Sequence, residues 1–247
     1  MKKLLYFTSL MLGLALTACQ EEPVSGTTVL SSEKTVAVAQ GQSLQLQTTT
    51  PADFAGNSLV WFSLDEETTT VQNGVVTGVK PGYTTVIATK DAKTVASYQV
   101  TVYNKKQYMA IDGVLYPILF MARYSGMGDY LYFIAEENLT AEDLNYSWDG
   151  WKMVDIDLYG TAATTLDEEF DLSTGSLGDN LRMYTYFDQM STYGYGDDFE
   201  SGTFLLSQND ANNCSIRIKG TYYDRNNGDT HTIDLYYDGK PDYNEVY

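Results

Sequence analysis

Apolar and polar residues alternate one by one through long stretches of this chain, and this period of two restricts the possible folds more than any other feature. It is clearest at residues 214–219, and it recurs at residues 44–47, 154–158 and 233–236. Successive side chains of a β-strand point to opposite faces, so the pattern predicts strands with one buried face. The sequence therefore predicts an all-β protein.

Composition divides the chain into two parts. Residues 27–103 hold six acidic and four basic residues, whereas residues 104–247 hold twenty-five acidic and nine basic residues. Seventeen of the twenty-one tyrosines also lie in the second part. We therefore predict two domains, 27–103 and 104–247, that join near Asn104-Lys105-Lys106.

The N-terminus has the order of a secretory signal peptide. Lys2 and Lys3 precede an apolar run at residues 4–16, and the small residues Thr17 and Ala18 follow. A run of this length is too short to span a membrane, which takes about 20 residues. Residues 1–18 are therefore predicted to be a cleaved signal peptide.

The predicted cleavage point is followed by a cysteine, in the sequence Leu16-Thr17-Ala18-Cys19. These four residues resemble the L-[AST]-[AG]-C lipobox of bacterial lipoproteins. The resemblance implies that the Cys19 thiol is lipidated and that residues 19–26 form a tether. The acidic start of this tether, Glu21-Glu22, resembles that of surface-exported lipoproteins of Gram-negative gut anaerobes. We expect the protein to be lipid-anchored in the outer membrane and exposed at the cell surface, with the periplasmic face as the alternative.

The charge and the cysteine count restrict partners and stabilisation. The whole chain carries a formal charge of −18, and this acidity argues against nucleic acid as a partner. After cleavage and lipidation Cys214 is the remaining thiol, so an intramolecular disulfide is excluded. Stability must then come from packed cores.

Residues 27–103 carry a series of features that match one known domain. They are Gly41 with the strand of Leu44 and Leu46, Pro51, Trp61 with Ser63, Val71, the turn Asn73-Gly74 with Val75 and Val76, Gly78, Pro81-Gly82 with Val86 and Ala88, and Val100 with Val102. Through them this part resembles the bacterial immunoglobulin-like group 2 domain, which implies a β-sandwich that serves as a spacer or adhesion module. Trp61 is expected to anchor the core of the sandwich.

Residues 104–247 predict an antiparallel β-sandwich or barrel of about eight strands. The one helix signal is residues 139–144, where Thr140 and Asp143 can form a capping box. Both ends of this part resemble the C-terminal domain of uncharacterised surface lipoproteins of gut anaerobes, through Asp112-Gly113 with Tyr116-Pro117, Ser201-Gly202-Thr203 and residues 214–239. This resemblance implies no known activity.

We predict no catalytic residues, no cofactor and no metal. His231 lacks the surrounding motif of a catalytic triad, and Cys214 lies on an apolar strand face. Asp155 and Asp157 share a strand face and could serve a glycosidase, but solvent-facing pairs of this kind arise by chance in an acidic chain. For calcium, the candidate carboxylates are Asp197, Asp198 and Glu200 in a glycine-rich stretch.

Four aromatic residues are candidates for ligand contact because they lie in expected loops near carboxylates. They are Trp148, Trp151, Tyr193 and Tyr195. The alternative is that these rings simply pack over the strands.

Together these features predict a non-enzymatic, lipid-anchored surface protein whose second domain binds a protein or a glycan. The alternative is a glycan-binding accessory lipoprotein of a polysaccharide uptake system. A glycoside hydrolase is the third candidate.

Overall fold

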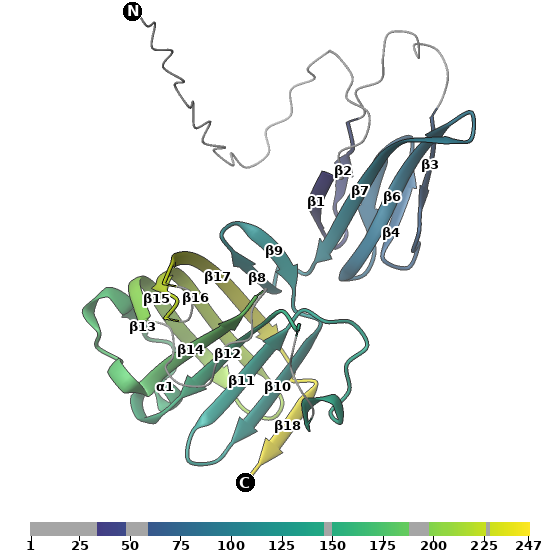
Figure 1. Ribbon diagram of the computed structural model, residues 1–247. Coiled ribbons are helices and arrows are strands. Elements are labelled where there is room, and N and C mark those ends of the chain that lie inside the picture. The colour runs from purple at the N-terminus through teal and green to yellow at the C-terminus, as the bar shows by residue number, and fades with distance from the viewer. Residues whose placement is uncertain (1–33, 48–58, 146–149, 188–197, 226–227) are drawn as a thin grey trace, which may run out of the picture.

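The computed structural model describes residues 34–47, 59–145, 150–187, 198–225 and 228–247, and they form two β-sandwiches joined by a short turn (Figure 1). The fold is almost entirely β, as predicted, and neither sandwich closes into a barrel. Among the described residues, no helix has the length and apolar character needed to cross a membrane.

The first sandwich packs a four-stranded sheet against a three-stranded sheet. The larger sheet has the order β1-β7-β6-β3, and the smaller has the order β2-β5-β4. The strands are β1 (Lys34–Ala39), β2 (Ser43–Gln45), β3 (Val60–Ser63), β4 (Thr69–Gln72), β5 (Val75–Gly78), β6 (Gly82–Lys90) and β7 (Lys93–Tyr103). All neighbours are antiparallel except β1 and β7, which run parallel.

The core of this sandwich is built from small and branched side chains around one tryptophan. Val76, Val86 and Val102 are fully buried, and the half-buried Trp61 packs against this cluster. Its ring centroid lies 6.2 Å from that of Tyr98. The β4–β5 turn has positive φ at Asn73 and Gly74, as the Asn-Gly pair predicts. The role of Trp61 as a core anchor is confirmed.

The second sandwich packs a six-stranded sheet, β13-β15-β16-β17-β8-β9, against a five-stranded sheet, β14-β12-β11-β10-β18. The strands are β8 (Gln107–Ile111), β9 (Val114–Pro117), β10 (Phe120–Ser125), β11 (Asp129–Ile134), β12 (Met153–Leu158), β13 (Glu169–Asp171), β14 (Leu181–Tyr186), β15 (Asp198–Asn209), β16 (Cys214–Tyr223), β17 (Thr230–Gly239) and β18 (Tyr243–Val246). The short helices are α1 (Gly160–Thr164), η2 (Asp143–Asn145), η3 (Leu172–Thr174) and η4 (Gly178–Asn180).

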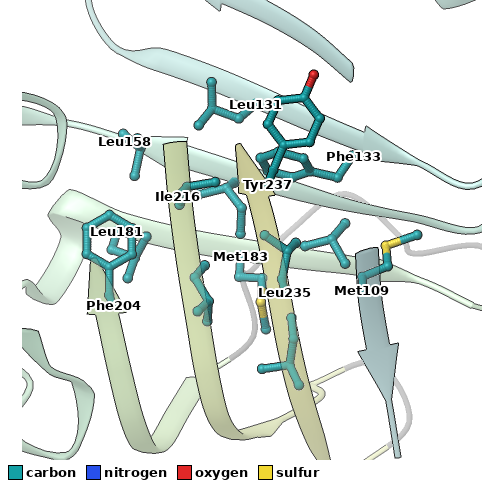
Figure 2. Close-up of a cluster of buried hydrophobic side chains, with 14 of the residues drawn as sticks. Met109, Leu131, Phe133, Leu158, Leu181, Met183, Phe204, Ile216, Leu235 and Tyr237 are labelled. Carbon is teal, nitrogen blue, oxygen red and sulfur yellow. The ribbon is translucent and has the colours of Figure 1, made fainter. Parts of the chain in front are cut away.

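The main core lies between these two sheets, and Figure 2 shows side chains from both sheets meeting there. Phe133 and Leu131 of β11 face Leu235 and Tyr237 of β17 in this cluster. Burying one such side chain contributes about 1.5–3 kcal/mol. The free cysteine Cys214 is itself one of the buried residues of this core.

Three expectations for this part need correction. The described part of this sandwich has eleven strands rather than about eight, and two of them give weak sequence signals, because β13 has three residues and β18 is mostly polar. Strand β18 pairs in parallel with β10, so the five-stranded sheet is not wholly antiparallel. At residues 139–144, the amide of Thr140 donates to Asp143 over 2.7 Å as in a capping box, but the element that follows is a three-residue 3-10 helix.

The join between the sandwiches is a tight turn. The amide of Gln107 donates to the carbonyl of Asn104 over 3.0 Å, and the Tyr103 and Tyr108 rings meet edge to face with centroids 5.9 Å apart. A second contact crosses the join, because the amide of Tyr83 donates to Oε1 of Glu137 over 3.0 Å.

Candidate functional site

The outer face of the five-stranded sheet, turned away from the main core, carries a row of tyrosines. Strand register places Tyr130 opposite Tyr124, and it places Tyr132 opposite Asp155, which in turn lies opposite Tyr184. Residues directly opposite one another in an antiparallel pair share a face. We call this surface the tyrosine face, and its tyrosines in the described part of the chain are Tyr124, Tyr130, Tyr132, Tyr159, Tyr184, Tyr186, Tyr243 and Tyr247.

A hollow of about 220 Å³ opens in the tyrosine face. Its lining residues are Tyr124, Tyr130, Tyr132, Leu144 and Tyr247. The Tyr124 and Tyr132 rings meet almost at right angles, with centroids 5.5 Å apart. The Tyr124 and Tyr247 rings are nearly parallel, with centroids 6.2 Å apart. The hollow therefore has aromatic walls in two orientations.

Carboxylates lie at the edge of the hollow. Glu245 of β18 accepts hydrogen bonds from the hydroxyls of Tyr243, over 2.7 Å, and Tyr247, over 3.2 Å. Burial, with the nearby Tyr243, Tyr247 and Glu245, raises the pKa of Tyr124 to about 12. The Tyr124 phenol consequently stays neutral, and this part of the face presents ring surfaces and hydroxyls beside the Glu245 carboxyl.

Asp155 and Asp157 lie side by side on the same face, in the middle of the sheet, and each is only 7% exposed. Burial, together with the neighbouring carboxyl of Asp157, raises the pKa of Asp155 well above its ordinary value. Burial also raises the pKa of Asp157, although Tyr159 and Arg182 act in the opposite direction. The expectation that this pair faces solvent was wrong, because flanking tyrosines and the other strands cover both faces of β12.

One carboxyl oxygen of this pair stands out. Oδ1 of Asp155 is buried and has no hydrogen-bond partner in the described part of the chain. An unsatisfied buried polar atom costs about 1–3 kcal/mol. The Asp155–Asp157 pair therefore lowers the free energy of unfolding.

A guanidinium already lies over one ring of this face. The Arg182 side chain lies 5.8 Å from the centroid of the Tyr159 ring, within the range of a cation–π interaction. The rings of this surface thus interact with an organic cation inside the protein itself.

Of the four predicted contact residues, Trp151 alone lies among the residues that the structure describes. Trp151 is half-buried and packs against the cluster of Phe120, Leu144 and Met153 beside the tyrosine face. Packing of this kind supports the alternative that the ring is structural. The other three candidates, Trp148, Tyr193 and Tyr195, lie outside the described residues, as does the lipidation candidate Cys19.

The calcium candidates do not form a site in the described residues. Asp198 pairs with Arg225 over 2.6 Å, Glu200 is exposed on β15, and Asp197 lies outside the described residues. Among the residues described, no group of three or more His, Cys, Asp or Glu side chains could hold a metal ion.

The two residues weighed as nucleophile or base have ordinary surroundings. Cys214 is fully buried, and burial raises the pKa of its thiol to about 12. Nδ1 of His231 lies 2.7 Å from Oδ2 of Asp112, at the end of β17. Neither residue lies on the tyrosine face.

Sequence reasoning missed a buried ionic network at the end of the second core. The Arg123 guanidinium, on the inner side of β10, donates to Asp129 over 2.9 Å, to Asn209 over 2.7 Å and to Asn244 over 3.0 Å. It ties the two sheets together. The available signal was an arginine directly after the apolar residues 118–122, two positions from Met121 and therefore on the same strand face.

Comparison with known proteins identifies the first sandwich only. Residues 25–102 match the family described as bacterial Ig-like domain (group 2), which confirms that resemblance. A search of curated proteins gave no significant match.

One solved structure is titled "Crystal Structure of a Bacterial Ig-like Domain Containing GH10 Xylanase from Termite Gut". It is 22% identical, with a TM-score of 0.24, over 38% of this chain and 24% of that chain. This chain therefore spans about a quarter of that protein, and a likeness at this level carries no functional argument.

Proposed function

We propose that this chain is a non-enzymatic, lipid-anchored cell-surface protein whose second sandwich binds a protein or glycan through the tyrosine face. The bacterial Ig-like domain at residues 25–102 supports a spacer role, since such domains hold other modules away from a membrane. The lipobox-like Cys19 supports the anchor, and several acyl chains on one residue would make it stable.

The tyrosine-lined hollow is the observation that carries the binding role. Tyrosines present a large apolar surface with a polar tip, and they are enriched where proteins contact partners. Eight of the described tyrosines gather here over one sheet face, and Tyr247 is 79% exposed.

The binding role is tested with the mature protein on a glycan array and on whole cells. We expect Tyr247→Leu to weaken the signal without changing the melting temperature, since that ring is mostly exposed. The matched control is Tyr223→Leu, a partly exposed tyrosine on β16 of the other sheet. Equal loss from both variants, or from neither, would refute binding at the tyrosine face.

The anchor is tested separately by metabolic lipid labelling. Cys19→Ser should abolish labelling and leave uncleaved precursor. Normal labelling of this variant would end the lipoprotein proposal.

The glycan-binding accessory of an uptake system is the second candidate. The aromatic rings beside hydrogen-bonding carboxyls on one surface favour it, because sugars are bound by ring faces and polar groups together. Genes for an outer-membrane importer and glycosidases next to this gene would support this narrower role.

A further inference from the structure

The walls of the hollow suit a compact group better than a flat one. A sugar ring stacks on a broad, coplanar aromatic surface, whereas here the Tyr132 ring stands 82° from the Tyr124 ring. The Tyr247 ring is tilted only 7° from the Tyr124 ring. A rounded group that enters the hollow would touch ring faces and edges from more than one side.

The size of the hollow points the same way. Its volume of about 220 Å³ lies below the roughly 300–1,000 Å³ of pockets for drug-sized ligands. One small headgroup therefore fits better than an oligosaccharide.

The charge around the hollow selects a cation. None of the lining residues that the structure describes is basic, and Glu245 accepts from the hydroxyl of the lining residue Tyr247. A phenol that donates to a carboxylate gains electron density in its ring, which strengthens its attraction for a cation. The nearby Arg182 lies instead over Tyr159, so it does not line the hollow.

We propose that the hollow binds an alkylammonium group, either a quaternary ammonium or a protonated amine, enclosed by Tyr124, Tyr132 and Tyr247. This inference rests on the proposed binding function of the tyrosine face and names its ligand chemistry. Aromatic rings combined with negative charge are the recognised means of holding such cations. The group could come from a choline-type headgroup or from an amino sugar.

The test is an NMR titration of the mature protein with matched probes that differ in charge. Choline is compared with 3,3-dimethyl-1-butanol, its uncharged isostere, and glucosamine is compared with glucose. We expect the cation of a pair to bind about tenfold more tightly than its neutral partner, with shifts centred on β10, β11 and β18. Preference for choline or for glucosamine then distinguishes the two sources.

Three variants test whether the cation binds in the hollow and whether the charge of Glu245 contributes to its binding. Tyr247→Leu should weaken cation binding about two- to fivefold, the range for one exposed ring, whereas Tyr223→Leu should leave it unchanged. Glu245→Gln should weaken the binding of the cations and leave the binding of the neutral probes unchanged.

Equal binding of charged and neutral probes, or no binding of either cation, would overturn the inference. The proposed function would still be judged on its own by the array and cell-binding signal of Tyr247→Leu.

Discussion

Replacing Asp155 by asparagine should stabilise the protein at neutral pH. Asp155 is 7% exposed, lies beside the carboxyl of Asp157, and has a buried oxygen without a partner among the described residues. Asparagine has nearly the same shape and no charge. Its amide can donate a hydrogen bond to the neighbouring carboxyl of Asp157.

The magnitude and its pH dependence follow from the direction in which folding moves each pKa. Folding raises the pKa of both carboxyls above the value of about 3.9 in an unfolded chain, so the folded state holds protons that the unfolded chain releases. Stability therefore falls as pH rises from about 4 through the raised pKa values, and a tenfold change in a proton-binding constant corresponds to about 1.4 kcal/mol. The gain from Asp155→Asn should be roughly 1–3 kcal/mol at neutral pH and should vanish near pH 3.

Calorimetry of the full chain between pH 3 and pH 8 measures this effect. For a protein of this size, each kcal/mol moves the melting temperature by about 2–4 °C. Asp157→Asn is the matched control and should gain less, because Tyr159 and Arg182 already favour the ionised form of Asp157. A variant at position 155 that is no more stable than the wild type at pH 7, or whose difference does not change with pH, would refute the reasoning.

Three further predictions concern stability and the join. Arg123→Met should destabilise the second sandwich by about 3–5 kcal/mol in urea unfolding, because it leaves the buried Asp129 carboxyl without its cation, although Asn209 still donates to it. The double variant with Asp129→Leu should recover part of the loss; a loss below 1 kcal/mol would contradict the network. The Cys214 thiol should resist iodoacetamide in the native protein and react fully in denaturant, since burial raises its pKa to about 12; native labelling at the rate of a free thiol would contradict this. Limited trypsin digestion should cut after Lys105, at the turn, and release two folded pieces; a chain that resists cleavage there would mean that the sandwiches unfold as one unit.

Much of the fold could be predicted from the sequence, because the alternation of apolar and polar side chains shows where a strand lies and which of its faces is buried. Ile216 and Ile218 alternate with Arg217 and Lys219, and β16 buries the first pair while the second lies on the opposite face. The Asn73-Gly74 turn was readable for the same reason, since its conformation depends on those two residues alone.

The pairing of β18 could not be predicted in the same way. Its residues, Tyr243–Val246, are mostly polar, and the strand forms only because β10 offers an edge to which it can bond in parallel. Such a contact joins segments more than a hundred residues apart, and nothing in either segment specifies the other.

The candidate site was harder to predict because it depends on strand order. Tyr130 and Tyr132 stand two apart on one strand, which places them on one face. However, Tyr184 and Tyr243 join them only through the order β14-β12-β11-β10-β18. The burial of Asp155 could not be predicted either, because it also depends on the order of the strands. A carboxylate that alternates with apolar residues usually faces solvent, unless the strand is central and its outer face is covered by neighbouring rings.

The inner and outer faces of β10 are coupled in a way that bears on binding. Arg123 is fixed on the inner side by Asp129, Asn209 and Asn244, and the next residue, Tyr124, lines the hollow on the outer side. The backbone that presents Tyr124 is thus held before any ligand arrives, so binding there has little ordering cost. Tyr247 lies just beyond the edge strand β18 and must lose more freedom when it closes on a ligand. Tyr124→Leu should therefore weaken binding more than Tyr247→Leu does, and the reverse order would mean that the hollow is not preformed.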